Sequence, residues 1–117
     1  MLPGWARLRH GEDFERVRRQ GKRWNGTYLR LNVAPNGRPN SRFGFVVSRK
    51  VGNTVTRNRI KRRLRAAVRR RLADIAVGFD VVVIAHPSAA EASYHDLDAS
   101  LGKLLQLACL VSAEDTP

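Results

Sequence analysis

The residues with the most evident chemistry are twelve basic side chains between residues 42 and 71, a segment that contains no acidic residue. The whole chain has 22 Lys and Arg against 10 Asp and Glu, a formal charge of +12, so this one segment accounts for the entire surplus. Guanidinium and ammonium groups bind phosphate oxygens through charge-assisted hydrogen bonds. The segment therefore predicts the binding of a polyanion such as a nucleic acid.

An amphipathic helix that begins near Thr56 is predicted to position these groups. Apolar residues recur along it at helical spacing and form a stripe that would face a core. They are Ile60, Leu64, Ala67, Val68, Leu72 and Ile75. At about 100° per residue, a narrow polar stripe lies directly beside the apolar one. This inner stripe consists of Asn58, Arg62, Arg65 and Arg69, with Lys61 at its border. Because a core would hold such a helix in place, we expect the inner stripe to be an ordered phosphate-binding surface.

A second, outer stripe of the same helix consists of Arg59, Arg63 and Arg70. For these side chains, simple solvation and contact with a polyanion are equally good interpretations. The inner stripe is therefore the better candidate for specific binding.

The sequence shows no residue pattern typical of a protein that cleaves nucleic acid by itself. A metal-dependent nuclease needs carboxylates gathered around cations, and residues 42–71 contain none. His10, His86 and His95 show no metal-ligand spacing. The one cysteine, Cys109, excludes a disulfide framework and a zinc-finger ligand set, and its place near the apolar side of the last helix predicts a buried, inert thiol.

Several further elements must surround the basic helix. Residues 11–21 predict a short helix that ends at Gly21, with Phe14 and Val17 on one face. Residues 28–33 alternate, which predicts a strand with Leu29, Leu31 and Val33 inward and with Tyr28, Arg30 and Asn32 on the other face. Residues 43–48 predict a second strand, expected to pair antiparallel with the first.

The remaining elements complete an α+β sandwich of helices against a sheet. The β-branched run at residues 81–85 predicts a strand buried on both faces and central in the sheet. Ser93 and Asp96 resemble a capping box that starts a final helix. The order is α-β-β-α-β-α, with a further short strand possible around residues 22–24. Trp5 and Trp24 are expected to dock or pack at edges, with stacking on RNA as the less favoured interpretation.

The length of 117 residues suits one domain, and we expect a single RNA-binding domain over residues 1–117. No apolar run approaches the roughly 18–20 residues that span a bilayer, and the start of the chain lacks the apolar segment of a secretory signal. These features predict a cytoplasmic protein without a membrane partner.

The segment from Arg49 to Arg65 closely resembles the signature of the bacterial ribonuclease P protein subunit. The family pattern is matched at Lys50, Gly52, Val55, Arg57, Asn58, Lys61, Arg62 and Arg65. The resemblance covers roughly residues 7–108, which leaves 109–117 as an expected flexible tail. The chain departs from the family at Ala66, where an acidic residue is common, and at Arg18, where a second aromatic is common.

The resemblance implies a fold similar to a domain of some ribosomal proteins, with a left-handed β-α-β crossover. It also implies a function as the subunit that joins a large catalytic RNA, which removes the 5′ leader from precursor tRNA. The protein would then be an accessory subunit of an endoribonuclease, with no catalytic side chain of its own and no required protein partner. Mg²⁺ would serve the holoenzyme and be bound mainly by the RNA.

The resemblance also assigns two sets of site residues. Those expected to bind the catalytic RNA are Arg49, Lys50, Arg57, Asn58, Arg59, Lys61, Arg62, Arg65 and Arg69. A groove for the single-stranded leader is expected to include Phe14, Tyr28 and Arg30, since aromatic rings stack on unpaired bases and a guanidinium holds a phosphate. Plain core packing is an equally good interpretation of Phe14, and Tyr28 is more often an ordinary strand residue.

Two other classes of RNA-binding protein share some of these features. Residues 42–46 resemble part of an RNA-recognition motif, but the match is incomplete and the helix-first order is wrong for that module. A ribosomal or other structured-RNA-binding protein without nuclease involvement remains the alternative. It explains the charge and size but not the Arg57-Asn58 signature.

Overall fold

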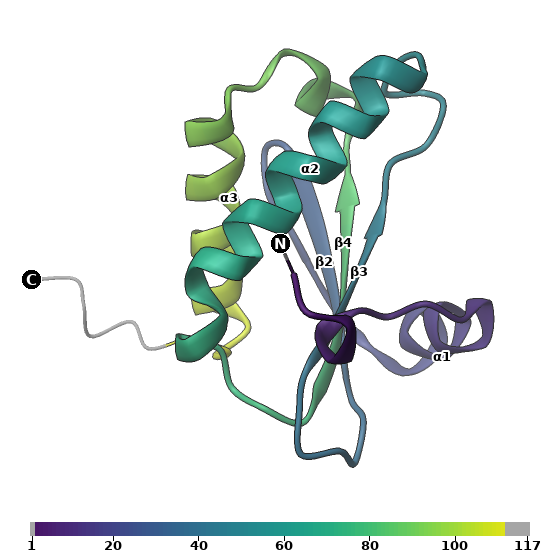
Figure 1. Ribbon diagram of the computed structural model, residues 1–117, viewed down its shortest axis with the longest axis vertical. Coiled ribbons are helices and arrows are strands. Elements are labelled where there is room, and N and C mark those ends of the chain that lie inside the picture. The colour runs from purple at the N-terminus through teal and green to yellow at the C-terminus, as the bar shows by residue number, and fades with distance from the viewer. Residues whose placement is uncertain (1, 112–117) are drawn as a thin grey trace, which may run out of the picture.

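The computed structural model describes residues 2–111, which form three α-helices, four strands and three short 3₁₀ turns (Figure 1). The helices are α1 (Gly11–Gln20), α2 (Thr54–Arg71) and α3 (Tyr94–Leu107). The strands are β1 (Lys22–Asn25), β2 (Leu29–Pro35), β3 (Arg42–Val46) and β4 (Phe79–Ala85), and the 3₁₀ turns are η1 (Gly4–Ala6), η2 (Leu72–Asp74) and η3 (Pro87–Glu91). This is the small α+β domain that the sequence predicts, and the short strand near residues 22–24 is present.

The four strands form one mixed sheet in the order β1-β2-β4-β3. Strand β4 is central, as predicted, because it pairs antiparallel with β2 and parallel with β3. The expected antiparallel pair between residues 28–33 and 43–48 is therefore wrong. The apolar run of β4 inserts between β2 and β3, where an inner position pairs both of its edges and the two apolar clusters cover its faces.

The connection from β3 through α2 to β4 is a left-handed crossover. In Figure 1 both strands run upward, α2 lies in front of the sheet, and β4 lies to the left of β3. A right-handed connection would place β4 to the right, and right-handed crossovers dominate in proteins. The unusual hand confirms what the family resemblance implies.

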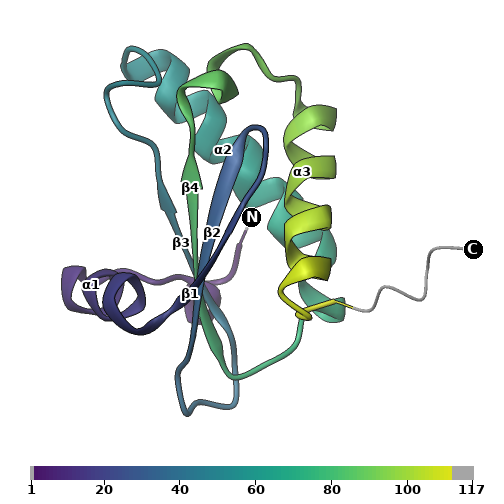
Figure 2. The same ribbon diagram turned by 180° about the vertical axis from the view of Figure 1, so that it is seen from behind.

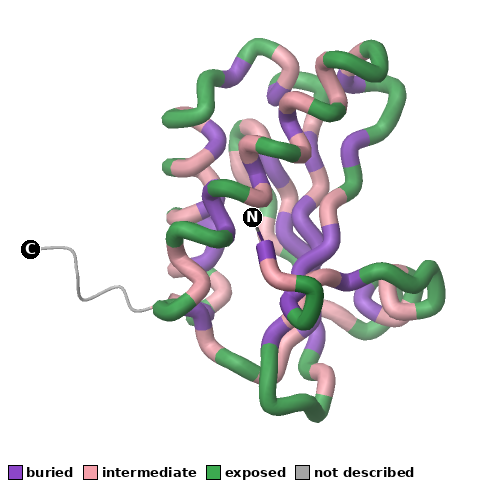
Figure 3. The backbone as a smooth tube through the Cα atoms, in the orientation of Figure 1, coloured by how far each residue is buried: buried purple, intermediate pink, exposed green. Residues whose placement is uncertain are grey.

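Two apolar clusters lie on opposite faces of the sheet. The larger one joins the sheet to α2 and α3 through buried Ile60, Leu64, Leu97 and Leu101. The smaller one lies under α1 and includes Leu8, Val17 and Val82, with Phe14 packed against it. Figure 3 shows buried residues along the strands, and Figure 2 shows α1 covering only part of its face.

Capping fixes where the two long helices start. The Asn53 side chain accepts from the Thr56 amide at 2.9 Å, so α2 begins two residues earlier than predicted. Ser93 and Asp96 form the predicted capping box of α3. These caps satisfy backbone N–H groups that a helix start otherwise leaves free.

The end of the described chain differs from two expectations. Cys109 is exposed, not buried, because the backbone turns there with φ of 60° after α3 has ended. Leu110 is buried, and its carbonyl accepts from the Ala76 amide at 2.7 Å, so the chain stays packed up to that residue. The rest of the predicted tail, residues 112–117, lies outside the described residues.

Candidate nucleic-acid interface

The inner stripe of α2 presents its basic groups without internal partners. Asn58, Arg62 and Arg69 are exposed, and Lys61 and Arg65 are half-buried at the edge of the core. Within residues 2–111, none of these five side chains takes part in a hydrogen bond or ion pair with another group of the chain. The sequence therefore places an ordered row of unneutralised charge on one side of the helix.

The outer stripe behaves differently, because its three arginines reach across to η3, the residue after it and α3. Arg59 Nη2 lies 3.4 Å from the Ala90 carbonyl, and Arg63 Nη1 donates to the Ala92 carbonyl at 3.1 Å. Arg70 pairs with Asp98 at 2.8 Å. These contacts hold α2 against η3 and α3, so the outer arginines are neither simply solvated nor fully free for a polyanion.

Asp98 of α3 is the acidic partner of the arginines at the end of α2. It forms ion pairs with both Arg70 and Arg71. Burial raises the pKa of Asp98, but the hydrogen bonds from Arg71 and Arg70 and their charges outweigh it, so the pKa lies below its ordinary value. The pairing offsets part of the charge of Arg70 and Arg71 at the C-terminal end of the basic helix and leaves the inner stripe charged.

The start of α2 holds the signature arginine in a fixed place. Arg57 donates from Nε to the Gly52 carbonyl at 3.2 Å and from Nη2 to Thr54 Oγ1 at 3.1 Å. Arg49 and Lys50 lie in the exposed turn just before the helix. The basic surface thus continues from the inner stripe around the N-terminal end of α2.

A groove of about 330 Å³ lies between the first residues of the chain, α1, β3 and α2. We call it the Phe14 groove. Its lining residues are Arg7, Leu8, Arg9, Phe14, Phe43, Gly44, Phe45, Lys61 and Arg65. It combines an aromatic edge with four basic side chains, two of which belong to the inner stripe or its border. The groove therefore adjoins the predicted phosphate-binding surface.

Phe14 both packs against the core and lines the groove. Its ring is half-buried against the smaller apolar cluster, and it also forms part of the wall of the groove. It lies over Gly44, where an added Cβ would come under 3.0 Å from two ring carbons. A side chain at position 44 would push the ring away from the sheet.

A network around Asp80 holds α1 to the sheet at this place. The Asp80 carboxylate is fully buried and receives hydrogen bonds from Arg42 at 2.7 and 2.9 Å, from Asn36 at 2.9 Å and from Arg16 of α1. Burial raises the pKa of Asp80, but the hydrogen bonds from Arg42 and Asn36 and the charges of Arg42 and Arg16 hold it below its ordinary value. Asp13 of α1 lies 3.5 Å from Arg42 and extends the network.

Sequence reasoning missed this network, although a signal was present. Arg42 and Asp80 are the charged residues at the beginnings of two apolar strands, and they lie opposite each other in the β3–β4 register. A parallel pairing of β3 with β4 would have brought them together.

Arg30 and Asn32 lie on the α1 face of the sheet, beside the Phe14 groove. The register places Asn32, Val82 and Gly44 in one row across the strands, and Arg30 lies in the next row. Asn32 is 2% exposed, and its Oδ1 and the Nε of Arg30 are buried without a hydrogen-bond partner among the described residues. Buried polar atoms are normally satisfied, so these two make this part of the sheet face a polar place with unused hydrogen-bonding capacity. The sequence predicted Arg30 as a site residue but not Asn32.

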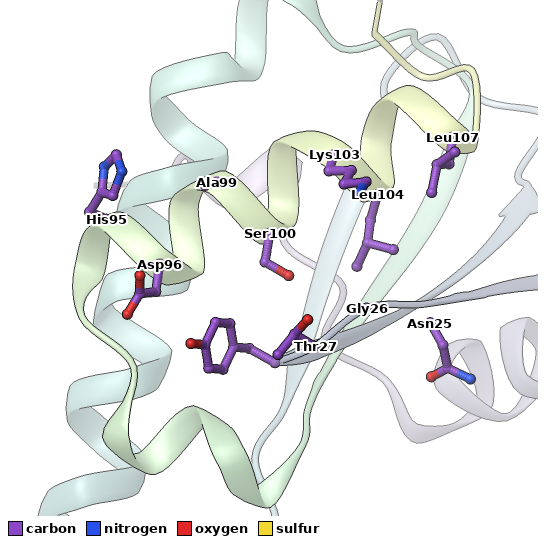
Figure 4. Close-up of a pocket in the computed structure, with 11 residues that line it drawn as sticks. Asn25, Gly26, Thr27, His95, Asp96, Ala99, Ser100, Lys103, Leu104 and Leu107 are labelled. Atoms are coloured by element: carbon purple, nitrogen blue, oxygen red, sulfur yellow. The ribbon is translucent and has the colours of Figure 1, made fainter.

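Tyr28 lies elsewhere, in a different hollow of about 670 Å³ between the β1–β2 turn and α3. Figure 4 shows this hollow, with Asn25, Gly26 and Thr27 on one side and residues from His95 to Leu107 of α3 on the other. Tyr28 precedes β2 and packs against the larger apolar cluster, because the strand alternation begins only at Leu29. The structure does not bring Tyr28 together with Phe14 and Arg30.

Two negative observations hold for residues 2–111. No group of three or more His, Cys, Asp or Glu side chains could hold a metal ion. None of the helices in this part of the chain is long and apolar enough to cross a membrane.

Comparison with known proteins connects this arrangement to one family. The family model described as "Ribonuclease P" matches residues 2–109. A "Ribonuclease P protein component" of Roseiflexus castenholzii is 46% identical over 114 residues, which cover 95% of this chain and 93% of the relative. The RNase P protein of Staphylococcus aureus superimposes with a TM-score of 0.86 at 28% identity, covering 92% and 98% of the two chains. The one from Thermotoga maritima gives 0.80 at 33%, covering 86% and 96%.

Proposed function

Since the chain belongs to the ribonuclease P protein family, we propose that it is the protein subunit of a ribonucleoprotein that removes the 5′ leader from precursor tRNA. In this proposal the chain binds two RNAs through two surfaces. The inner stripe of α2 binds the catalytic RNA, and the Phe14 groove with the adjoining sheet face binds the leader.

The unpartnered charge on α2 supports the first half of the proposal. Arg62, Arg65 and Arg69 lie in one row on a helix whose opposite face is buried in the core. A folded RNA presents phosphates at fixed places, and a helix packed against the core holds the backbone of these arginines at a fixed spacing to meet them. Arg57, fixed by its own hydrogen bonds, extends this surface to the start of the helix.

The Phe14 groove supports the second half. An unpaired leader offers base faces and phosphates, and the groove offers an aromatic ring beside Arg7, Arg9, Lys61 and Arg65. Arg30 and Asn32 add an unsatisfied donor and acceptor on the neighbouring part of the sheet. Tyr28 lies in the other hollow, so the proposal assigns the leader to Phe14, Arg30 and Asn32.

The chemistry of strand cleavage is assigned to the RNA. Metal ions stabilise the charge that develops during phosphodiester cleavage, and Mg²⁺ prefers oxygen ligands. The proposed RNA-binding surface is lined by arginines and lysines, which repel a cation and cannot ligate it. The residues that line this surface therefore do not fit a Mg²⁺ site, and the proposal places the ion with the RNA in the holoenzyme.

The observation that carries the proposal is the free arginine row of α2 beside a groove that the half-buried Phe14 lines. Reconstitution tests it directly. The chain combined with its cognate RNA and Mg²⁺ should cleave precursor tRNA at the mature 5′ end, whereas the chain alone should not. Robust cleavage by a nuclease-free preparation of the chain without RNA would refute the proposal.

The RNA that co-purifies with the chain from the native host distinguishes the proposed function from the alternative. A large structured RNA other than ribosomal RNA supports the proposed function. Ribosomal RNA alone would favour the alternative of a ribosomal or other structured-RNA-binding protein.

A further inference from the structure

A third hollow lies at the end of the sheet farthest from the start of α2, between η1 and the loop that joins β2 to β3. Its volume is about 340 Å³, near the lower end of the roughly 300–1,000 Å³ range of ligand pockets. We call it the Trp5 hollow. Its chemically active lining consists of Trp5, Arg7, Arg9, His10, Arg38 and Arg42. Nothing in the proposed function uses this hollow.

Both walls of the Trp5 hollow are held in place by hydrogen bonds. In the loop, Asn36 donates from Nδ2 to the Asn40 carbonyl at 3.0 Å, and its Oδ1 accepts from the Arg38 amide at 2.8 Å. On the other wall, Arg7 Nε donates to the Leu2 carbonyl at 3.2 Å, and Ala6 is buried. The hollow therefore exists before any ligand binds.

The side chains facing it suit a nucleotide. The Trp5 indole is 53% exposed although the residues around it are anchored. Arg42 is occupied by Asp80 and Asp13, but the side chains of Arg9 and Arg38 make no hydrogen bond or ion pair within residues 2–111. The Arg9 guanidinium lies 3.3 Å from where a Cβ of Gly4 would be, so it lies over η1 next to Trp5. An indole stacks on a base and a guanidinium binds its phosphate.

The Trp5 hollow adjoins the Phe14 groove, because Arg7 and Arg9 line both. These two arginines thus lie between a strand held in the groove and the hollow. We infer that the Trp5 hollow binds an unpaired nucleotide of the 5′ leader beyond those held in the Phe14 groove, with its base on Trp5 and its phosphate between Arg9 and Arg38. This inference rests on the proposed function and extends the leader-binding surface to the first residues of the chain.

The test uses the reconstituted holoenzyme and precursor tRNAs whose leaders are lengthened one nucleotide at a time. With the wild-type chain, affinity should rise until the leader reaches the hollow. Trp5→Ala should remove the last part of this rise and weaken binding of the longest leaders by about tenfold, the effect of losing one stacked base. Short-leader precursors should bind both proteins equally, and Trp5→Phe should restore most of the loss.

Matched control variants separate the hollow from general effects. Leu107→Ala removes an apolar side chain that is also 53% exposed but lies at the other hollow, and it should leave the leader series unchanged. Arg38→Ala should weaken binding of long leaders more than Arg19→Ala, which removes an exposed charge of α1 outside the hollow. Thermal melts of all variants should coincide with the wild type.

A fluorescence measurement gives a second readout that does not depend on affinity. In a Trp24→Phe background Trp5 is the sole tryptophan, and its emission should change only when the leader is long enough to reach it. An emission independent of leader length would overturn the inference.

The outcomes distinguish this inference from the proposed function. A wild-type holoenzyme whose affinity ignores leader length would contradict the proposed function itself. A normal wild-type series that Trp5→Ala and Arg38→Ala leave intact would overturn only the inference about the hollow. Weaker assembly of Trp5→Ala with the catalytic RNA, measured without precursor, would also overturn it, because the hollow would then bind that RNA instead of the leader.

Discussion

The ring of Phe14 lies so close over Gly44 that no side chain fits between α1 and β3 at this point. The contact joins the helix that carries the groove's aromatic edge to the strand that forms its floor. Gly44→Ala should therefore shift Phe14 and cost about 1–3 kcal/mol of unfolding free energy, as overpacking of a core does. Urea unfolding measures this cost.

Gly11→Ala provides the matched control for that substitution. A Cβ at Gly11 meets nothing within 4 Å, and alanine is the better helix former, so this change should leave stability equal or slightly higher. Equal stability losses for the two variants would show that the close contact with Phe14 is not the reason why Gly44→Ala is destabilising.

The lowered pKa of Asp80 leads us to expect a specific loss of stability in acid. Its pKa in the folded chain is lower than its ordinary value near 3.8, so its stabilisation is complete above that value and is lost as the pH falls through the lower, folded-state pKa. Asp80→Asn should lose about 3–5 kcal/mol at neutral pH, because Arg42 and Arg16 are left without the buried carboxylate. The difference between the two proteins should then shrink in acid.

Urea unfolding of both proteins from neutral to acidic pH measures this behaviour. Glu91→Gln serves as a control that removes an exposed carboxylate. A constant difference between wild type and Asp80→Asn across the whole range would contradict the role assigned to the Asp80 network.

The two stripes of α2 should respond differently to removal of an arginine. The exposed Arg62 side chain makes no hydrogen bond or ion pair within residues 2–111, so Arg62→Ala should reduce the slope of log affinity for the catalytic RNA against log salt by up to about one unit, without loss of stability. Arg63 donates to the Ala92 carbonyl, so Arg63→Ala should lower the melting temperature and change the slope less. Equal slopes for the two variants would show that the inner and outer stripes contribute equally to binding the catalytic RNA.

The sequence predicted the elements and the exposed side of α2 well, for a physical reason. The apolar stripe of α2 and the capping box of α3 are local patterns, and the side of α2 that stays exposed follows from the side that is buried. Local patterns do not determine which strands pair. The sequence therefore missed the insertion of β4 between β2 and β3, and with it the Arg42–Asp80 network that this pairing creates.

Tyr28 illustrates the same limit within the site. Strict alternation places it on the face of Arg30, but β2 begins at Leu29, and the residue before a strand is free to turn toward another element. It turns toward α3. The alternation places Asn32 on the face of Arg30, but only the folded sheet shows that its Oδ1 is buried without a hydrogen-bond partner among the described residues.

The division of the protein into one surface for the catalytic RNA and another for the leader is tested most directly by Phe14→Ala. The measurement is the ratio of holoenzyme affinities for precursor tRNA and mature tRNA, made with variants whose circular dichroism and thermal melts match the wild type. The account predicts that this ratio falls by about tenfold or more, the equivalent of one lost stacked base, while affinity for the catalytic RNA stays unchanged. An unchanged ratio, or a loss confined to assembly with the catalytic RNA, would contradict it.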